Sequence, residues 1–98
     1  MSERASESAP SRELLLATHA FPGEYIVKAF GPGTDEFRAQ VHAVAAAVVG
    51  IARLQSTERA TKSARRICIT LVLAVDTVDE VIAVYHQIAG VDGLLMLL

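Results

Sequence analysis

The chain has 98 residues, of which 52% are hydrophobic and 20% are charged, and its formal net charge is −2. This length suits one small domain with a buried core of its own, and this composition excludes wholesale disorder. The charge does not favour binding to nucleic acid or to an anionic membrane. A lone cysteine, Cys68, excludes an internal disulfide.

The N-terminal region is polar and mixed in charge. Residues 1–12 are rich in serine and alanine and lack apolar periodicity, which predicts a disordered tail. Residues 13–98 then form the single folded domain, and Leu14–Leu16 should lie against its edge as a helical turn or an irregular strand. The apolar runs are shorter than the roughly 18–20 residues that cross a bilayer, and nothing resembles a secretory signal. We therefore expect a cytoplasmic protein with no membrane partner.

The first strand is predicted over Glu24–Phe30, where alternation places Tyr25, Val27 and Ala29 on the core face. The glycine, proline and glycine that follow predict a tight turn over residues 31–33. This stretch therefore predicts a strand that turns directly into a helix.

The first helix should begin after Thr34, a favourable N-cap, because apolar side chains recur at helical spacing from Phe37 onward. Acidic residues in its first turn complement the helix dipole. The helix should run to Val49 and end at Gly50.

Two further strands and a hairpin loop follow this helix. Residues 51–59 predict a strand of weak alternation, and residues 60–64 predict a polar hairpin loop. Residues 65–75 are apolar on both faces and rich in β-branched side chains, which is typical of a central strand.

Thr77 and Glu80 form a capping-box pattern, which predicts the start of a second helix that ends at Gly90. Residues 93–98 predict a final apolar strand. The order strand, helix, strand, strand, helix, strand is that of an α+β, ferredoxin-like βαββαβ two-layer sandwich. Right-handed crossovers place the first and third strands in the middle of a four-stranded antiparallel sheet, with both helices on one face.

Six residues around the first strand form a short motif: Phe21, Pro22, Tyr25, Val27, Lys28 and Gly31. This motif resembles that of the YbeD-like family of small bacterial proteins, whose function is uncharacterised, and the similarity continues to Leu94–Leu98. The resemblance implies a ferredoxin-like fold similar to the ACT-type regulatory domains of amino-acid metabolism. It also implies a small regulatory or interaction module with no established catalysis. The hairpin departs from the serine-rich pattern of relatives over residues 61–66.

The turn before the first helix is a candidate effector site, because free N–H groups at a helix N-terminus can hold a carboxylate or a phosphate. Its residues are Gly31, Pro32, Gly33 and Thr34. ACT-type domains bind amino-acid effectors in this region. Against this interpretation, Asp35 and Glu36 would repel an anion, and the same residues suit a plain strand-to-helix turn. An amino-acid or metabolite effector stays open as an alternative.

Five basic residues lie close together in the sequence: Arg53, Arg59, Lys62, Arg65 and Arg66. Within this stretch only Glu58 opposes them. The cluster could contact an acidic protein surface, or RNA, since the ferredoxin-like fold also underlies the RNA-recognition motif. That motif stacks bases on aromatic side chains of the central strands, and here the third strand has none. RNA binding is kept as an alternative function, and a nucleic-acid partner is disfavoured.

The sheet face that points away from the helices should be largely apolar. One alternate set of the third strand is Ile67, Ile69, Leu71 and Leu73, the other is Cys68, Thr70, Val72 and Ala74, and the pattern leaves open which set faces the helices. A large exposed apolar face is unusual on a monomer. We therefore expect a twofold homodimer, or cover by Leu14–Leu16. The candidate dimer face comprises Ile26, Phe30, Ile67, Ile69, Leu71, Leu73 and Met96.

The chemical groups of the chain do not indicate catalysis. The three histidines, His19, His42 and His86, lack the spacing of a zinc site, and neither a P-loop nor a dinucleotide-binding motif is present. Phe37-Arg38 resembles the Phe-Arg pair of acylphosphatases, but the chain has no asparagine to position their attacking water. We expect no enzyme activity, cofactor or metal, and a regulatory or interaction role with an unidentified protein partner.

Overall fold

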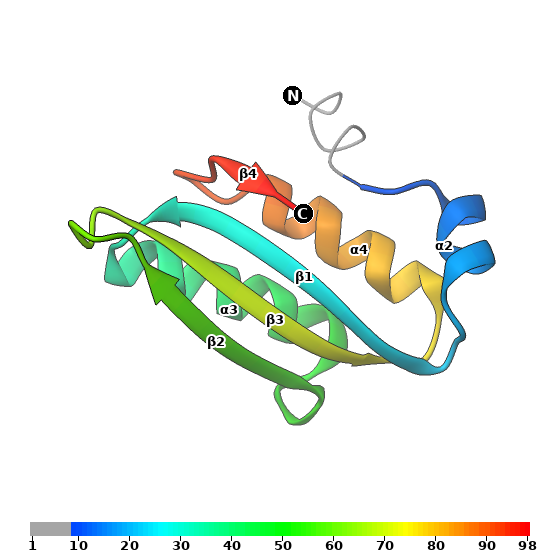
Figure 1. Ribbon diagram of the computed structural model, residues 1–98. Coiled ribbons are helices and arrows are strands. Elements are labelled where there is room, and N and C mark those ends of the chain that lie inside the picture. The colour runs from blue at the N-terminus through cyan, green and yellow to red at the C-terminus, as the bar shows by residue number, and fades with distance from the viewer. Residues whose placement is uncertain (1–8) are drawn as a thin grey trace.

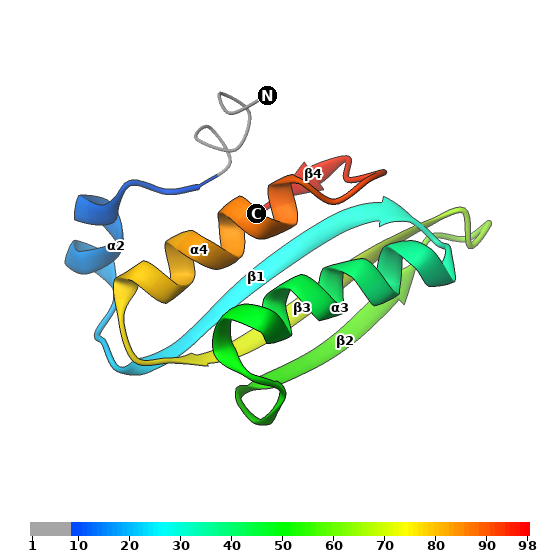
Figure 2. The same cartoon turned by 180° about the vertical axis from the view of Figure 1, so that it is seen from behind.

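A four-stranded antiparallel sheet covered by two helices forms the domain, which the computed structural model describes over residues 9–98 (Figure 1). The strands are β1 (Gly23–Pro32), β2 (Leu54–Ala60), β3 (Arg66–Val75) and β4 (Met96–Leu97). The helices are α2 (Arg12–Thr18), α3 (Asp35–Val49) and α4 (Val78–Ala89), and a 3-10 turn, η1 (Ile51–Arg53), precedes β2. Helices α3 and α4 lie on the same face of the sheet (Figure 2).

The strand order is β2-β3-β1-β4, which confirms the predicted α+β, two-layer arrangement with β1 and β3 in the middle. β1 pairs with β3 along its whole length, from Gly23 opposite Val75 to Pro32 opposite Arg66. β4 is shorter than the strand predicted over residues 93–98. Its hydrogen bonding nevertheless continues for one residue beyond it, because the last residue of the chain exchanges two backbone hydrogen bonds with β1.

The core lies between the helices and the inner face of the sheet. Tyr25, Val27 and Ala29 are buried, as the alternation along β1 predicts. Residues that are directly paired in an antiparallel sheet share a face, so the β3 residues opposite these three also point into the core. The buried residues of β3 are Ile67, Ile69, Leu71, Leu73 and Val75.

This placement corrects the candidate dimer face. Four of its members belong to the core: Ile67, Ile69, Leu71 and Leu73. The other three, Ile26, Phe30 and Met96, lie on the side of the sheet away from the helices. Both sides of β3 are largely apolar, so the alternation alone could not show which side the helices cover. The structure shows that they cover the side with the larger side chains.

Helix α2 packs against α4 at the end of the helix layer, which corrects the alternative cover of the sheet by Leu14–Leu16. The middle leucine of this segment is buried, and Arg12 forms an ion pair with Asp79 at the start of α4. The helix thus begins within the tail predicted over residues 1–12. Residues 1–8 of that tail lie outside the described residues.

β1 continues further than predicted and includes Pro32, so the turn into α3 is confined to Gly33 and Thr34. Alternate residues of such a strand direct their backbone groups to opposite edges. Lys28 bonds towards β4, whereas the Gly33 N–H donates to the Arg65 carbonyl on the β3 side, at 2.9 Å. The nitrogen of Pro32 therefore points to the β4 edge, where no strand pairs with it and its missing N–H is tolerated.

Helix α3 begins and ends as predicted. The Thr34 hydroxyl accepts a hydrogen bond from the Phe37 N–H at 3.2 Å, and Gly50 follows the last turn with a φ of +87°. Phe37 is buried beneath β1, and a Cβ at Gly31 would overlap its ring. Glycine at this position therefore lets the helix pack close to the strand.

Helix α4 also begins as predicted, with the Thr77 hydroxyl accepting from the Glu80 N–H at 3.4 Å. The Glu80 carboxylate reaches back to the N–H of Asp76, one residue before the N-cap, at 2.7 Å. The strand predicted over residues 51–59 begins later in the structure. Its first three predicted residues form η1 instead, and β2 begins at Leu54.

Candidate functional site

One face of the sheet carries no helix and is seen from the front in Figure 1; we call it the open face. By strand register it comprises Glu24, Ile26, Lys28, Phe30, Pro32, Gln55, Thr57, Arg59, Arg66, Cys68, Thr70, Val72, Ala74, Met96 and Leu98. Ile26 is 55% exposed and Met96 is 50% exposed. Exposed apolar side chains that gather on one face are typical of an interaction surface.

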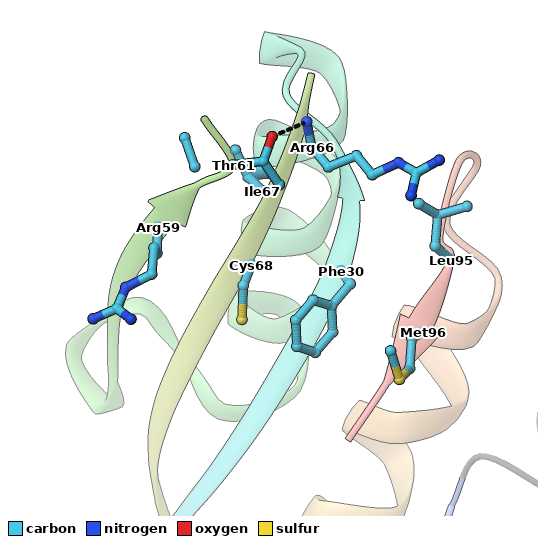
Figure 3. A pocket seen from close by; sticks show the side chains of 9 residues that line it. Phe30, Arg59, Thr61, Arg66, Ile67, Cys68, Leu95 and Met96 are labelled. Carbon is cyan, nitrogen blue, oxygen red and sulfur yellow. Dashed lines mark hydrogen bonds between the residues drawn. The ribbon is translucent and has the colours of Figure 1, made fainter. Parts of the chain in front are cut away.

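A hollow of about 430 Å³ lies at one end of the open face, between β1, β3, the β2–β3 hairpin and the segment that leads into β4 (Figure 3). The ring of Phe30 lies between Cys68 and Met96, and Leu95 stands at the β4 side. A second hollow, of about 600 Å³, adjoins the first and shares Phe30, Arg59 and Cys68 with it. The two hollows together form one trough. The first hollow has an apolar floor, whereas the second is partly polar, because Lys28, Thr57, Arg59 and Thr70 line it.

Two guanidinium groups stand at opposite sides of the hollow. Arg59 rises on the β2 side, and Arg66 extends across towards Leu95 on the β4 side (Figure 3). Lys28 lines the adjoining part of the trough. The ion pairs found among residues 9–98 involve none of these three cations. The exposed apolar side chains and the basic hairpin, which the sequence predicts separately, therefore lie together at this site.

Glu58 does not neutralise these charges, although it lies next to Arg59 in the sequence. It is paired with Ile69 in the sheet and so points to the helix side, where its carboxylate accepts a hydrogen bond from Arg38 Nε at 2.8 Å. Alternation along β2 thus separates the acidic side chain from the basic one.

The structure divides the predicted basic cluster. Arg53 lies in η1, at the other end of β2 from the hairpin, where it donates to the Val49 carbonyl at 2.7 Å. It also pairs with Glu80 at 2.8 Å and Asp76 at 3.2 Å. The hydrogen bond from Arg53, followed by that from the Asp76 N–H, lowers the pKa of Glu80. Arg53 therefore joins the end of α3 to the start of α4 and lies apart from the basic residues of the hairpin.

The other four basic residues stay together at the hairpin: Arg59, Lys62, Arg65 and Arg66. The Thr61 N–H donates to the Arg66 carbonyl at 2.9 Å, and the Arg66 N–H donates to the Thr61 hydroxyl at 3.3 Å. Ala64 has a φ of +58°, which completes the tight reversal. These bonds fix the backbone from which Arg66 reaches over the hollow.

The candidate effector turn is largely filled by the protein itself. A Cβ at Gly33 would lie 2.5 Å from the Ala64 carbonyl oxygen, and the Gly33 N–H is already bonded to the hairpin. The Thr34 hydroxyl caps the helix, and the acidic Asp35 and Glu36 follow in its first turn. The geometry of this turn therefore fits its structural role as the connection between β1 and α3.

Cys68 is half-exposed on the floor of the hollow, although β3 is a central strand. Sequence reasoning missed its proximity to Phe30, which follows only from the β1–β3 register. The alternation along β1 did place Lys28 on the solvated side. The position of Lys28 beside Thr70 and near the hairpin cations could be found only from the sheet register.

Within the described part of the chain, the three histidines do not form a cluster with other residues that could bind a metal ion. His19 packs against Tyr25 with tilted rings whose centroids are 4.7 Å apart, while His42 and His86 belong to different helices. Within residues 9–98, no three histidine, cysteine, aspartate or glutamate side chains are placed to hold a metal ion. In the same part of the chain, none of the helices has the length and apolar character required to span a membrane.

Fold and surface together define a small α+β domain whose uncovered sheet face combines apolar side chains with cations that have no ion pair among residues 9–98. The sequence model of the family described as "protein of unknown function (DUF493)" matches residues 17–98. The chain therefore belongs to this family. Comparison with curated proteins and with solved structures gave no match.

Proposed function

We propose that this domain is a protein-interaction module without catalytic activity of its own, and that its partner binds the open face. The observation that carries this proposal is the hollow at the hairpin end of the open face, whose apolar lining is left uncovered by both helices. Apolar surface of this kind gains free energy when a partner removes it from water. A regulatory or scaffolding role would act through this contact.

A second copy of the chain is the partner expected from sequence, and the charge distribution disfavours it at this surface. A twofold axis through the trough would bring Lys28, Arg59 and Arg66 close to the same residues of the other copy. Like charges brought together in this way repel one another, most strongly when water is removed. A partner with a different surface fits the open face better.

Single-stranded RNA is the second candidate, because Phe30 lies among three cations on a central strand. A base could stack on this ring. The neighbouring strand offers Cys68, Thr70 and Val72 on the same face, none of which provides a second stacking surface. This observation favours a protein over RNA.

The proposal is tested by capture of partners from the cells that produce the protein, with two double variants. Ile26→Glu with Met96→Glu places charge on the open face. Leu14→Glu with Ile51→Glu makes the same chemical change at exposed apolar residues elsewhere, on α2 and η1.

We expect the wild-type protein and the Leu14/Ile51 variant to capture the same partner and the Ile26/Met96 variant to lose it. Thermal unfolding should show that both variants keep their fold, because all four positions are at least half-exposed. Equal capture by the two variants would place the interaction on another surface.

A further inference from the structure

The open face carries a local positive charge that the net charge of −2 conceals. Around the hollow, Arg59 and Arg66 have no acidic partner among the described residues. The nearest acidic residue in the sequence, Glu58, points to the other side of the sheet and pairs with Arg38. Glu24 does lie on the open side, but at the opposite end of β1.

The hollow itself is apolar between these cations. Phe30, Leu95 and Met96 line it, and its volume of about 430 Å³ falls within the range of roughly 300–1,000 Å³ over which proteins enclose compact groups. An apolar side chain that enters this space is partly removed from water and contacts apolar side chains. Guanidinium groups at its rim favour carboxylates, which they can bind through two parallel hydrogen bonds.

We propose that the partner docks through an acidic segment that carries one apolar anchor side chain. The anchor enters the hollow beside Phe30, and carboxylates on either side of it pair with Arg59 and Arg66 (Figure 3). This inference rests on the proposed function and adds the chemistry of the partner to it. The separation of the two guanidiniums across the hollow sets the order acidic, apolar, acidic in the segment.

Cys68 supplies a direct readout of occupancy, because it is the only cysteine of the chain and lies on the floor of the hollow. The probe is a synthetic peptide with glutamates on both sides of one phenylalanine, and the rate of Cys68 alkylation by neutral iodoacetamide is followed by mass spectrometry. At ten times its Kd the peptide should slow alkylation about tenfold, because about a tenth of the protein stays free.

Two matched peptides separate the contributions of charge and anchor. Replacing the glutamates with lysines should abolish protection, and replacing the phenylalanine with alanine should weaken it strongly. Protection should also weaken on raising salt from about 0.05 M to about 0.5 M, because salt screens the ion pairs at the exposed rim. Equal protection by the glutamate and lysine peptides would overturn the inference.

Charge reversal on the protein tests the assigned residues. Arg59→Glu with Arg66→Glu should lose protection by the glutamate peptide and gain protection by the lysine peptide, a gain that an unfolded variant could not show. Lys62→Glu makes the same kind of change on the hairpin without lining the hollow, and it should keep protection by the glutamate peptide. Retained binding of the glutamate peptide by the double variant would overturn the inference.

The remaining outcomes distinguish this inference from the proposed function. A cellular partner that is lost with Ile26→Glu and Met96→Glu but kept with Arg59→Glu and Arg66→Glu leaves the open face as the interaction surface and overturns its acidic specificity. Protection of Cys68 by single-stranded RNA but not by the glutamate peptide also overturns the inference. So does protection that grows with protein concentration alone, since it identifies a second copy as the occupant.

Discussion

The hydroxyls of Tyr25 and Tyr85 meet in the core at 3.2 Å, with their rings edge to face at 6.1 Å. Burial, together with this hydrogen bond, raises the pKa of Tyr85. The folded state thus favours the neutral phenol. The stability that this group contributes is fully present below the ordinary tyrosine pKa of about 10 and is lost as pH rises from there towards the folded-state pKa.

Tyr85→Phe should lower the free energy of unfolding at neutral pH by about 1 kcal/mol, because the Tyr25 hydroxyl loses its buried partner. The variant should also lose less stability than the wild-type protein above pH of about 10. Urea unfolding at neutral and alkaline pH measures both effects. An equal alkaline loss in the two proteins would contradict the assignment of that loss to Tyr85.

The Glu80 carboxylate shows the opposite pH dependence. Its pKa is lowered by the hydrogen bond from Arg53 and then by that from the Asp76 N–H. The stability that it contributes is therefore present above the ordinary glutamate pKa of about 4.3 and is lost as pH falls through the folded-state pKa.

Glu80→Gln should destabilise the domain at neutral pH by about 1 kcal/mol, and the difference from wild type should close as pH falls below about 4. Glu36→Gln serves as the control, because Glu36 also lies in the first turn of a helix but has no ion pair among the described residues. Thermal unfolding across this pH range checks the prediction. A pH-independent difference for Glu80→Gln would show that the charge is not involved.

At the scale of elements, the packing of α3 against β1 depends on the absence of a side chain at Gly31. The ring of Phe37 occupies the space that a Cβ would need. The two elements are joined by a turn of two residues, so the helix has little freedom to move away. This contact makes Gly31 a structural position, although its neighbours in the sequence also suit an effector turn.

Gly31→Ala should therefore lower the free energy of unfolding by about 1–3 kcal/mol through overpacking. Gly90→Ala is the matched control, because a Cβ there would meet its nearest neighbour at 3.6 Å and the backbone φ is −89°. Differential scanning calorimetry of the two variants compares them directly. Equal melting temperatures would contradict the close packing at Gly31.

Most element boundaries follow from local chemistry, and the departures have identifiable causes. The start of α3 at Thr34, its end at Gly50 and the cap at Thr77 depend on the residues themselves, which is why the sequence predicts them. The extension of β1 through Pro32 depends on which edge its nitrogen faces, and the conversion of Ile51–Arg53 into η1 accompanies contacts to distant elements. Tertiary neighbours decide these features, and local sequence does not show them.

At the scale of the whole molecule, the site was only partly predictable from the sequence, because tertiary neighbours decide which of its residues come together. Alternation shows that Lys28 and Phe30 share a side of β1, and composition shows that the hairpin is basic. That Arg66 and Phe30 line the same hollow, while Arg53 lies at the far end of β2, depends on the sheet register. Similarly, only the fold shows that Glu58 is turned away from its basic neighbour.

If the open face is reserved for an acidic partner, the isolated protein should leave it accessible. The alkylation rate of Cys68 should then be independent of protein concentration, because like charges oppose pairing of two troughs. Light scattering on the same samples separates this from dimerisation through another surface. A rate that falls as concentration rises, together with a doubled molar mass, would instead support the twofold homodimer expected from the sequence.

The most direct measurement is photo-crosslinking from Cys68 in extracts of the cells that produce the protein. A photoreactive maleimide on this thiol samples what lies over the hollow, and mass spectrometry identifies the linked peptide. The interaction proposed for the open face predicts a peptide from a different protein, with acidic residues on both sides of an apolar one. A linked peptide from a second copy of this chain, a linked ribonucleotide or a linked peptide without acidic residues would contradict it.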